Sequence, residues 1–353
     1  MHTKLRLSVL FIGFLMMTYP GGLWAEESAS GVNQEIEQLL QVDELSIRGA
    51  EILTQEFILD VYQNRGFAPY WTQPDRVKEL MELINDSVDH GLNPADYNID
   101  QVQQVLQSRL DNPAVQTKAE ADILLTESLL RYGYHRRFGK VKASTLDPDI
   151  NFRRETFKQQ SFSTNIEQGL ASSSLTDFIE LLAPIGMVYE KLQAQMKFYR
   201  QLAADGGWAS IPEGPTLHPG DQDERVALVR SRLSATSRIT DSDVQDPTLF
   251  DKALENAIED FQFRHQLDQD GVVGPLTLAS LNMSVEERIN QIRASLERLR
   301  WARQENADKL VVVNIAGFRA FFIKNGEIEW ETKAMVGKHY RQTPVFRGDI
   351  AYL

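Results

Sequence analysis

The 353-residue sequence contains no cysteine. This absence excludes disulfide bonds, cysteine-ligated zinc and a thiolate nucleophile within the chain. Histidine is scarce as well, and no two histidines have the spacing of a zinc-binding pair: they stand at positions 2, 90, 135, 218, 265 and 339. A Gly-x-Ser-x-Gly elbow, a His-Glu-x-x-His pair and a phosphate-binding loop are also absent. The sequence therefore offers no candidate catalytic, cofactor-binding or metal-binding residues.

Positive charge is in deficit: 50 acidic against 37 basic residues give a formal net charge of −13. Nucleic-acid binding relies on a surface of lysine and arginine that neutralises phosphates. A nucleic-acid partner is therefore not expected. The hydrophobic fraction of 42% is ordinary for a globular protein, and the length favours about two or three domains.

A long hydrophobic run occurs only at the N-terminus. Lys4 and Arg6 precede an apolar run over residues 7–19, and Pro20 ends the run before Ala25. This pattern is typical of a secretory signal peptide, and the run is shorter than the roughly 20 residues that cross a bilayer. We expect cleavage after Ala25 and a periplasmic protein, with an uncleaved inner-membrane anchor as the less favoured alternative. Mass spectrometry of the exported chain tests this expected start.

The expected mature chain begins with a polar linker over residues 26–44 and continues as a helical domain over 45–212. Apolar residues at helical spacing, from Ile36 onward, predict a helical region that ends near Gly66. His90 falls in the last turn of a predicted helix, where a partly charged imidazole would complement the helix dipole. The basic run 135–137 is interpreted as a solvated helix end.

A small module is predicted over residues 223–282, after a Pro- and Gly-rich linker at 213–222. Two amphipathic helices are indicated by apolar residues at i, i+3 and i+4 spacing: Val226, Val229 and Leu233 in the first, and Phe250, Leu254, Ala257, Ile258 and Phe261 in the second. A turn at Asp270-Gly271 and an apolar pair at 272–273 follow. Pro275 then starts a third helix, with Leu278 and Leu281 pointing inward.

The order Phe261-Gln262, His265, 270–275 and Thr277 resembles the peptidoglycan-binding module of bacterial wall enzymes. The resemblance covers about sixty residues and implies peptidoglycan as a partner. A three-helix spacer between two other parts is the alternative. An EF-hand calcium site is not expected, because the third acidic ligand and the closing glutamate of that loop are missing.

The chain after the module changes from helical to strand periodicity. A connecting helix is predicted over 283–305, with Ser284 and Glu287 as a capping box and one apolar seam: Val285, Ile289, Ile292, Leu296 and Leu299. Within residues 306–353, the period of 2 predicts a buried strand over 310–315, a second strand over 319–324, and a tight hairpin turn at Asn325-Gly326 into a third strand over 327–335.

Two further stretches resemble the large periplasmic L,D-transpeptidases. The scaffold domain of that family is resembled by four segments: 67–97, 139–141, 146–147 and 206–212. The opening of its catalytic domain is resembled by a second set near the C-terminus: 311–315, 318–319, 325–326, Trp330, 336–338 and 340–346. The expected fold class is therefore α + β and multidomain. A mainly helical scaffold carries a three-helix peptidoglycan-binding-like module, and the first β-strands of an incomplete all-β catalytic domain follow.

The resemblance implies acyl transfer between peptide stems through a cysteine acyl-enzyme. Because the sequence has no cysteine, the chain is expected to be inactive as given, with the catalytic region beyond it. Other wall-synthesis proteins are conceivable partners. Two alternatives stay open: a non-catalytic wall-binding scaffold protein that arose by truncation, and a different wall hydrolase that shares only the binding module. The scaffold and hairpin resemblances argue against the second.

Overall fold

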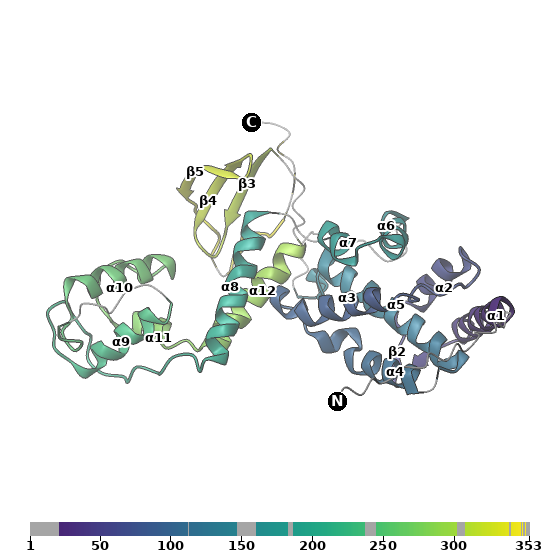
Figure 1. Ribbon diagram of the computed structural model, residues 1–353. Helices are drawn as coiled ribbons and strands as arrows, with labels where there is room; N and C mark the ends of the chain where they lie inside the picture. Colours follow the sequence, from purple (N-terminus) through teal and green to yellow (C-terminus); the bar gives the residue numbers. More distant parts are fainter. Residues whose placement is uncertain are drawn as a thin grey trace, which may run out of the picture. The chain divides into compact units, whose positions relative to one another are not determined.

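The computed structural model describes residues 21–111, 113–146, 160–182, 186–236, 245–301, 308–338, 340–346, 348 and 350. Twelve α-helices lie in this part of the chain, followed by a small antiparallel sheet (Figure 1). The expectation of a mainly helical protein with a few C-terminal strands is confirmed. Among the described helices, none has both the length and the apolar character that spanning a bilayer requires. Residues 1–20, most of the expected signal peptide, lie outside the description.

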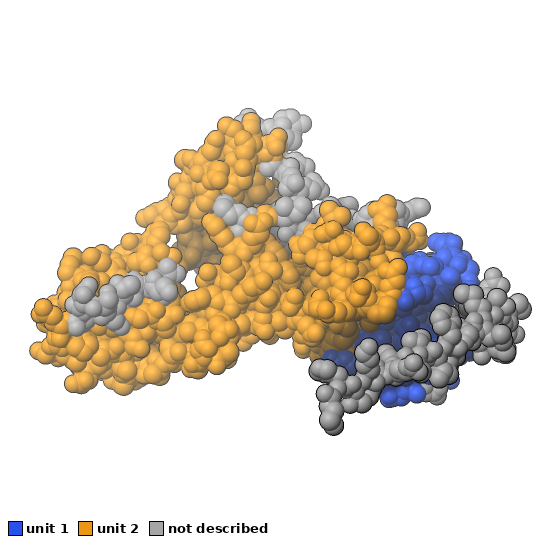
Figure 2. All heavy atoms as spheres, viewed as in Figure 1, with its two compact units in different colours: residues 1–72, 101–126 blue, residues 73–100, 127–353 orange. Residues whose placement is uncertain are grey.

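Contacts divide the chain into two compact units, coloured separately in Figure 2. The first unit comprises the chain up to Thr72 together with Gln101–Thr126, and the second comprises Gln73–Asp100 and the chain from Glu127 onward. Helices α4 (Ile99–Asp111) and α5 (Val115–Phe138) run across these boundaries.

The first unit begins with α1 (Gly21–Leu40), which corrects the expectation of a linker over 26–44. Val32, Ile36 and Leu40 recur every four residues and are all buried, so burial of this stripe extends the helix upstream of Ile36. The predicted continuous helical region is also wrong. A short hairpin interrupts it before α2 (Gln55–Gln63): β1 (Ser46–Ile47) pairs with β2 (Ala50–Glu51) around a two-residue turn with positive φ at both positions.

A buried carboxylate, Asp122 of α5, organises the core of this unit. Its oxygens accept hydrogen bonds from the Tyr62 hydroxyl and from the backbone N–H groups of Tyr70 and Trp71, the last two at 2.9 Å. The Trp71 indole donates to Thr126 Oγ1, also at 2.9 Å. Burial raises the pKa of Asp122, and the three donors partly offset that effect. One carboxylate thus fixes the aromatic corner after α2.

The second unit holds the remaining scaffold helices, the module and the sheet. The scaffold helices are α3 (Pro74–Asn85), the short 3₁₀ helices η1 (Asp86–His90), η2 (Pro94–Tyr97) and η3 (Ala143–Thr145), then α6 (Gln160–Ala171), α7 (Leu175–Leu182) and α8 (Met187–Ala204). The module contains α9 (Glu224–Ser234), α10 (Lys252–Arg264) and α11 (Pro275–Leu281).

The connecting helix α12 (Val285–Trp301) packs on α8. Its predicted seam is confirmed. Leu296 is buried against Tyr189 and Met196 of α8 with Ile289, Ile292 and Leu299 packed around it, and Val285 is also buried. The capping box is confirmed as well: Ser284 N donates to Glu287 Oε2 at 2.8 Å, and Glu287 N donates to Ser284 Oγ at 3.2 Å.

The sheet has the order β3-β4-β5 and is antiparallel throughout, with β3 at Lys309–Asn314, β4 at Arg319–Lys324 and β5 at Glu327–Lys333. The predicted tight turn at Asn325-Gly326 is confirmed, with positive φ at both residues. The prediction that the first strand is buried is wrong. Val311 and Val313 are each 49% exposed, because no described residue forms a layer over them. An apolar strand is buried only where a second layer covers it.

Candidate functional site

The module has its own hydrophobic core. The predicted faces of α9 and α10 are confirmed, since all eight of their named apolar residues are buried together with Val273 and Leu281: Val226, Val229, Leu233, Phe250, Leu254, Ala257, Ile258 and Phe261. Leu278 packs against this core from its edge. The backbones of Val273 and Leu217 exchange two N–H···O hydrogen bonds, with N···O distances of 3.0 and 3.3 Å. These bonds join the loop before α11 to the segment that precedes α9.

A buried glutamine, Gln262 of α10, builds the loop between α10 and α11. Its side-chain amide donates to Asp270 Oδ1 at 2.7 Å, to the Val272 carbonyl at 3.0 Å and to Thr277 Oγ1 at 3.1 Å. Its carbonyl oxygen accepts from the N–H of Gly271 at 3.0 Å. Gly271 has φ +69°, a conformation that favours glycine. Residues of the segment that resembles wall-binding modules therefore meet in one loop. The Gln262 side chain holds that loop together through its hydrogen bonds.

The chain enters and leaves the module at the same place. Ile211 N donates to Asn282 Oδ1 at 2.8 Å, and Asn282 Nδ2 donates to the Ile211 carbonyl at 2.9 Å. The module is thus an insertion between α8 and α12, two helices that pack on each other. An insertion joined at one point can be removed without breaking the elements on either side.

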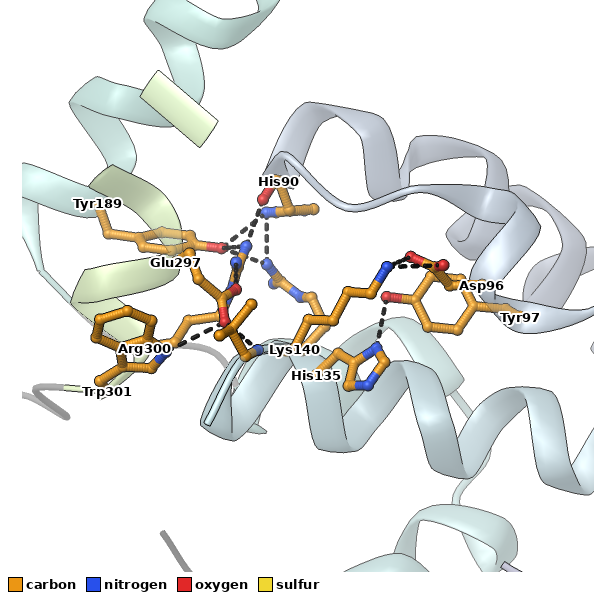
Figure 3. A network of polar contacts seen from close by, with 11 residues as sticks. His90, Asp96, Tyr97, His135, Lys140, Tyr189, Glu297, Arg300 and Trp301 are labelled. Atoms are coloured by element: carbon orange, nitrogen blue, oxygen red, sulfur yellow. Dashed lines mark hydrogen bonds and ion pairs between the residues drawn. The ribbon is translucent and has the colours of Figure 1, made fainter. Parts of the chain in front are cut away.

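A second cluster of polar side chains lies in the scaffold around two buried arginines (Figure 3). The Tyr189 hydroxyl accepts hydrogen bonds from Arg136 Nη1 and from Arg300 Nη2, each at 2.9 Å. Arg136 also contacts His90 Nδ1, and Arg300 also donates to the His90 carbonyl. Glu297 of α12 pairs with Arg300 at 3.1 Å. These contacts join α12, α8, α5 and η1.

The state of His90 corrects the sequence-based interpretation of this residue. His90 does end a helix, since η1 terminates there and Gly91 follows with φ +70°. However, burial, with help from the charges of Arg136 and Arg300, lowers the pKa of His90 to about 2. The imidazole is therefore neutral at physiological pH and acts as an acceptor. It neither complements a helix dipole by charge nor exchanges protons near neutrality.

The basic run 135–137 is likewise not a solvated helix end. Arg136 is 0% exposed, and the His135 ring lies 3.2 Å from the Tyr97 hydroxyl. The buried stripe of α5 contains Leu129 and Tyr132, and Arg136 follows at the next helical step, so it points inward with them. The positive charges of this run led to the prediction that it is exposed to solvent. The position of Arg136 in the helical repeat instead places it in the buried stripe.

Two family models match this chain. The Scaffold domain model matches residues 56–196, and the peptidoglycan binding domain model matches residues 222–281. The chain carries a Scaffold domain and a peptidoglycan-binding domain. Among the curated proteins, no similar sequence was found. The match over 222–281 coincides with the folded module, so this part supports a function related to peptidoglycan.

The two arginine positions were missed by sequence reasoning. Arg136 lies within the Scaffold match, whereas Arg300 lies beyond its end and reaches the cluster from α12. Within the described residues, no group of three or more histidine, aspartate or glutamate side chains could hold a metal ion. The cluster has a neutral imidazole, two buried guanidinium groups, the Tyr189 hydroxyl and the Glu297 carboxylate. Its hydrogen bonds and ion pair hold scaffold helices together from the inside.

The peptidoglycan-binding domain is expected to lose stability in acid. The pKa of Asp270 is held below its ordinary value of 3.8 by the Val272 N–H and the Gln262 amide, and that of Asp223 by Arg225. A carboxylate whose folded pKa is depressed contributes stability that is present above the unfolded pKa and is lost as pH falls through the folded pKa. Urea unfolding of residues 213–283 should therefore show a constant midpoint above about pH 5 and a falling midpoint below about pH 4.

The matched variant for this experiment is Asp270→Asn. It keeps an acceptor oxygen for Gln262 and Val272 but cannot ionise. Its midpoint should be lower than that of the wild type at neutral pH and should fall less steeply in acid. An identical slope in both proteins would show that Asp270 does not contribute to the acid sensitivity.

Proposed function

We propose that this chain binds peptidoglycan in the periplasm and forms the scaffold and wall-binding parts of a cross-linking protein of the L,D-transpeptidase type. Binding to peptidoglycan is supported by the folded module at 222–281, because its sequence matches the peptidoglycan-binding domain. The strongly acidic balance of the chain means that it recognises the wall through shape and hydrogen bonds and does not rely on general charge attraction.

The proposal of L,D-transpeptidase type rests on the order of the parts. A Scaffold domain precedes the module, and an antiparallel sheet follows α12 where the sequence resembles the opening of that family's catalytic domain. Acyl transfer in that family uses a cysteine thiolate, and the sequence contains no cysteine. The absence of cysteine also favours a second candidate, a non-catalytic wall-binding scaffold. In either case the described chain contributes binding and support.

Wall binding is tested by excising the module. Because Ile211 and Asn282 are hydrogen-bonded to each other, residues 213–281 can be replaced by a short glycine-serine linker that leaves α8 and α12 packed. The full chain should pellet with purified peptidoglycan sacculi, and the excised chain should stay in the supernatant. Circular dichroism of the excised chain checks that the scaffold is still folded. Equal pelleting of both proteins would contradict the assignment of binding to the module.

The absence of a nucleophile leads to a separate expectation. A carbapenem, the β-lactam class expected to acylate the cysteine of L,D-transpeptidases, should form no covalent adduct with this chain, because no thiol is available to open the ring. Intact-protein mass spectrometry after carbapenem exposure measures this directly. A stoichiometric mass increase would show that another residue of the chain acts as the nucleophile.

A further inference from the structure

The C-terminal end of α10, in the peptidoglycan-binding domain, contacts the turn between β3 and β4. The Arg319 guanidinium, at the start of β4, lies over the Phe263 ring with its Cζ atom 5.5 Å from the ring centroid. This distance is within the range of a cation–π contact. Glu331 of β5 forms an ion pair with Arg319 and so holds the guanidinium on the sheet. The contact therefore joins two separately folded parts of the second unit.

Gly317, in the same turn, lies against Gln266, the second residue after α10. A Cβ atom at Gly317 would lie 2.9 Å from Gln266 Nε2 and 2.7 Å from Asn314 Nδ2. Gly317 is buried although the residues on either side of it are exposed. Its φ is outside the left-handed region, so the backbone of the turn does not itself require glycine. The missing side chain instead makes room for two amide groups, one from the sheet and one from the domain.

Two residues at this contact have a backbone conformation that their residue types disfavour. Gln266 has φ +59° and Phe318 has φ +52°. Gln266 follows the C-cap residue of α10, and the next N–H group, that of Leu267, donates to the Gln262 carbonyl at 2.9 Å. Glycine is the usual residue at this left-handed position. A strained glutamine there is consistent with a side chain that has a use, and its amide reaches Gly317.

The domain needs only a weak second contact to be held in one orientation, because it is already tethered. Ile211 and Asn282 exchange two hydrogen bonds where the chain enters and leaves the domain. Gly206 and Gly207, with φ +99° and +68°, precede this point. A tethered domain meets its docking surface within the same molecule and does not pay the cost of bringing two molecules together. One attachment point allows the domain to swing, and a second contact made by different residues fixes its orientation.

We propose that the β3–β4 turn is an internal docking surface for the peptidoglycan-binding domain. Phe263 and Gln266 anchor the domain side, and Gly317 and Arg319 form the sheet side. The docked domain and the sheet then move as one body. This docking goes beyond the proposed function and does not depend on it. When the domain binds peptidoglycan, the docking holds the sheet in a fixed orientation relative to the bound wall.

The test measures the distance between the domain and the sheet in the full chain. Because the sequence has no cysteine, two introduced cysteines take spin labels only where they are wanted. Leu276→Cys in α11 and Glu327→Cys in β5 suit this purpose, since both positions are exposed. Double electron–electron resonance of this labelled chain should give one narrow distance distribution. Phe263→Ala and Gln266→Gly, each added singly, should broaden the distribution and lower the fraction of molecules at the docked distance.

A charge variant and its matched control address the sheet side of the contact. Arg319→Gln removes the cation from the Phe263 ring and should also broaden the distribution. Lys324→Gln removes a cation from the same strand, one that pairs with Glu329 at 3.1 Å, and should leave the distribution narrow. Equal broadening by both variants would show that any loss of charge on β4 disturbs the sheet and would contradict a specific role of Arg319.

Gln266→Gly gives a second readout that separates docking from stability of the domain. Glycine adopts the left-handed conformation at less cost, so hydrogen–deuterium exchange of α10 amides should be as slow as in the wild type or slower. A glutamine that served only the domain would give slower exchange with an unchanged distance distribution.

A broad distribution in the labelled chain without further substitution would overturn the docking surface. A narrow distribution in Phe263→Ala, Gln266→Gly and Arg319→Gln alike would overturn it too. Exchange over α9–α11 checks that each variant domain is folded, and the three variants change separate side chains, so loss of folding in one leaves the other two to decide. Pelleting with sacculi tests the proposed function separately, because either result there leaves the distance measurement valid.

Discussion

Phe261→Ala is expected to destabilise the peptidoglycan-binding domain by about 3–5 kcal/mol, the usual cost of truncating a buried phenylalanine. Phe261 is 2% exposed, lies in the centre of the core formed by α9, α10 and α11, and stacks on the His265 ring with the centroids 3.9 Å apart. A domain of about sixty residues has little stability to lose, because a chain of that size buries a modest fraction of its surface. The variant module should therefore be largely unfolded at room temperature.

The matched control is Phe263→Ala, a truncation of the same residue type on the same helix. Phe263 is 50% exposed and lies outside the module core, so its truncation should cost less than about 1 kcal/mol. Hydrogen–deuterium exchange of the full chain reports the two variants locally. Peptides from α9–α11 should lose protection in Phe261→Ala and keep it in Phe263→Ala, with peptides from the first unit unchanged in both. Equal protection in the two variants would show that Phe261 is not central to the core.

Asp122→Ala is expected to destabilise the first unit by at least about 2 kcal/mol. The substitution removes the acceptor of two backbone N–H groups, those of Tyr70 and Trp71, and one acceptor of the Tyr62 hydroxyl, which keeps Thr126 Oγ1 at 2.8 Å. Each buried donor that loses its partner costs about 1–3 kcal/mol. Asp122→Asn retains one acceptor oxygen and should show a smaller loss of stability. Comparing the two variants therefore separates the contribution of the hydrogen bonds from that of the side-chain volume.

Glu120→Ala provides the control on the same helix. Glu120 pairs with Arg48 at 3.1 Å, and the Arg48 side chain is about a third exposed, so this ion pair is expected to contribute at most about 1 kcal/mol. Exchange of backbone amides around residues 62–71 measures the effect. Fast exchange in Asp122→Ala together with wild-type exchange in Glu120→Ala is the expected result. Slow exchange in both would mean that the aromatic corner is held by apolar packing alone.

The elements of the module follow from signals that lie close together in the sequence. The faces of α9 and α10 have helical spacing, Pro275 starts α11, and Asp270-Gly271 gives the turn before it. Capping at Ser284 and the hairpin turn at Asn325-Gly326 are local in the same sense. Each of these features depends on residues within a few positions of one another, so a single sequence determines them.

Tertiary structure determines which charged side chains are buried. Arg136, Arg232 and Arg300 are common surface residue types, and they are buried because helical phase directs them toward partners distant in the sequence: His90, Leu281 and Tyr189. The same packing makes His90 a neutral acceptor. Conversely, Val311 and Val313 have the composition of a buried strand and are exposed, because burial requires a covering layer. The sequence by itself determined periodicity, caps and turns, which act over one or two helical turns. Which polar groups are desolvated depends on surfaces brought together from distant segments, and only the folded chain shows this.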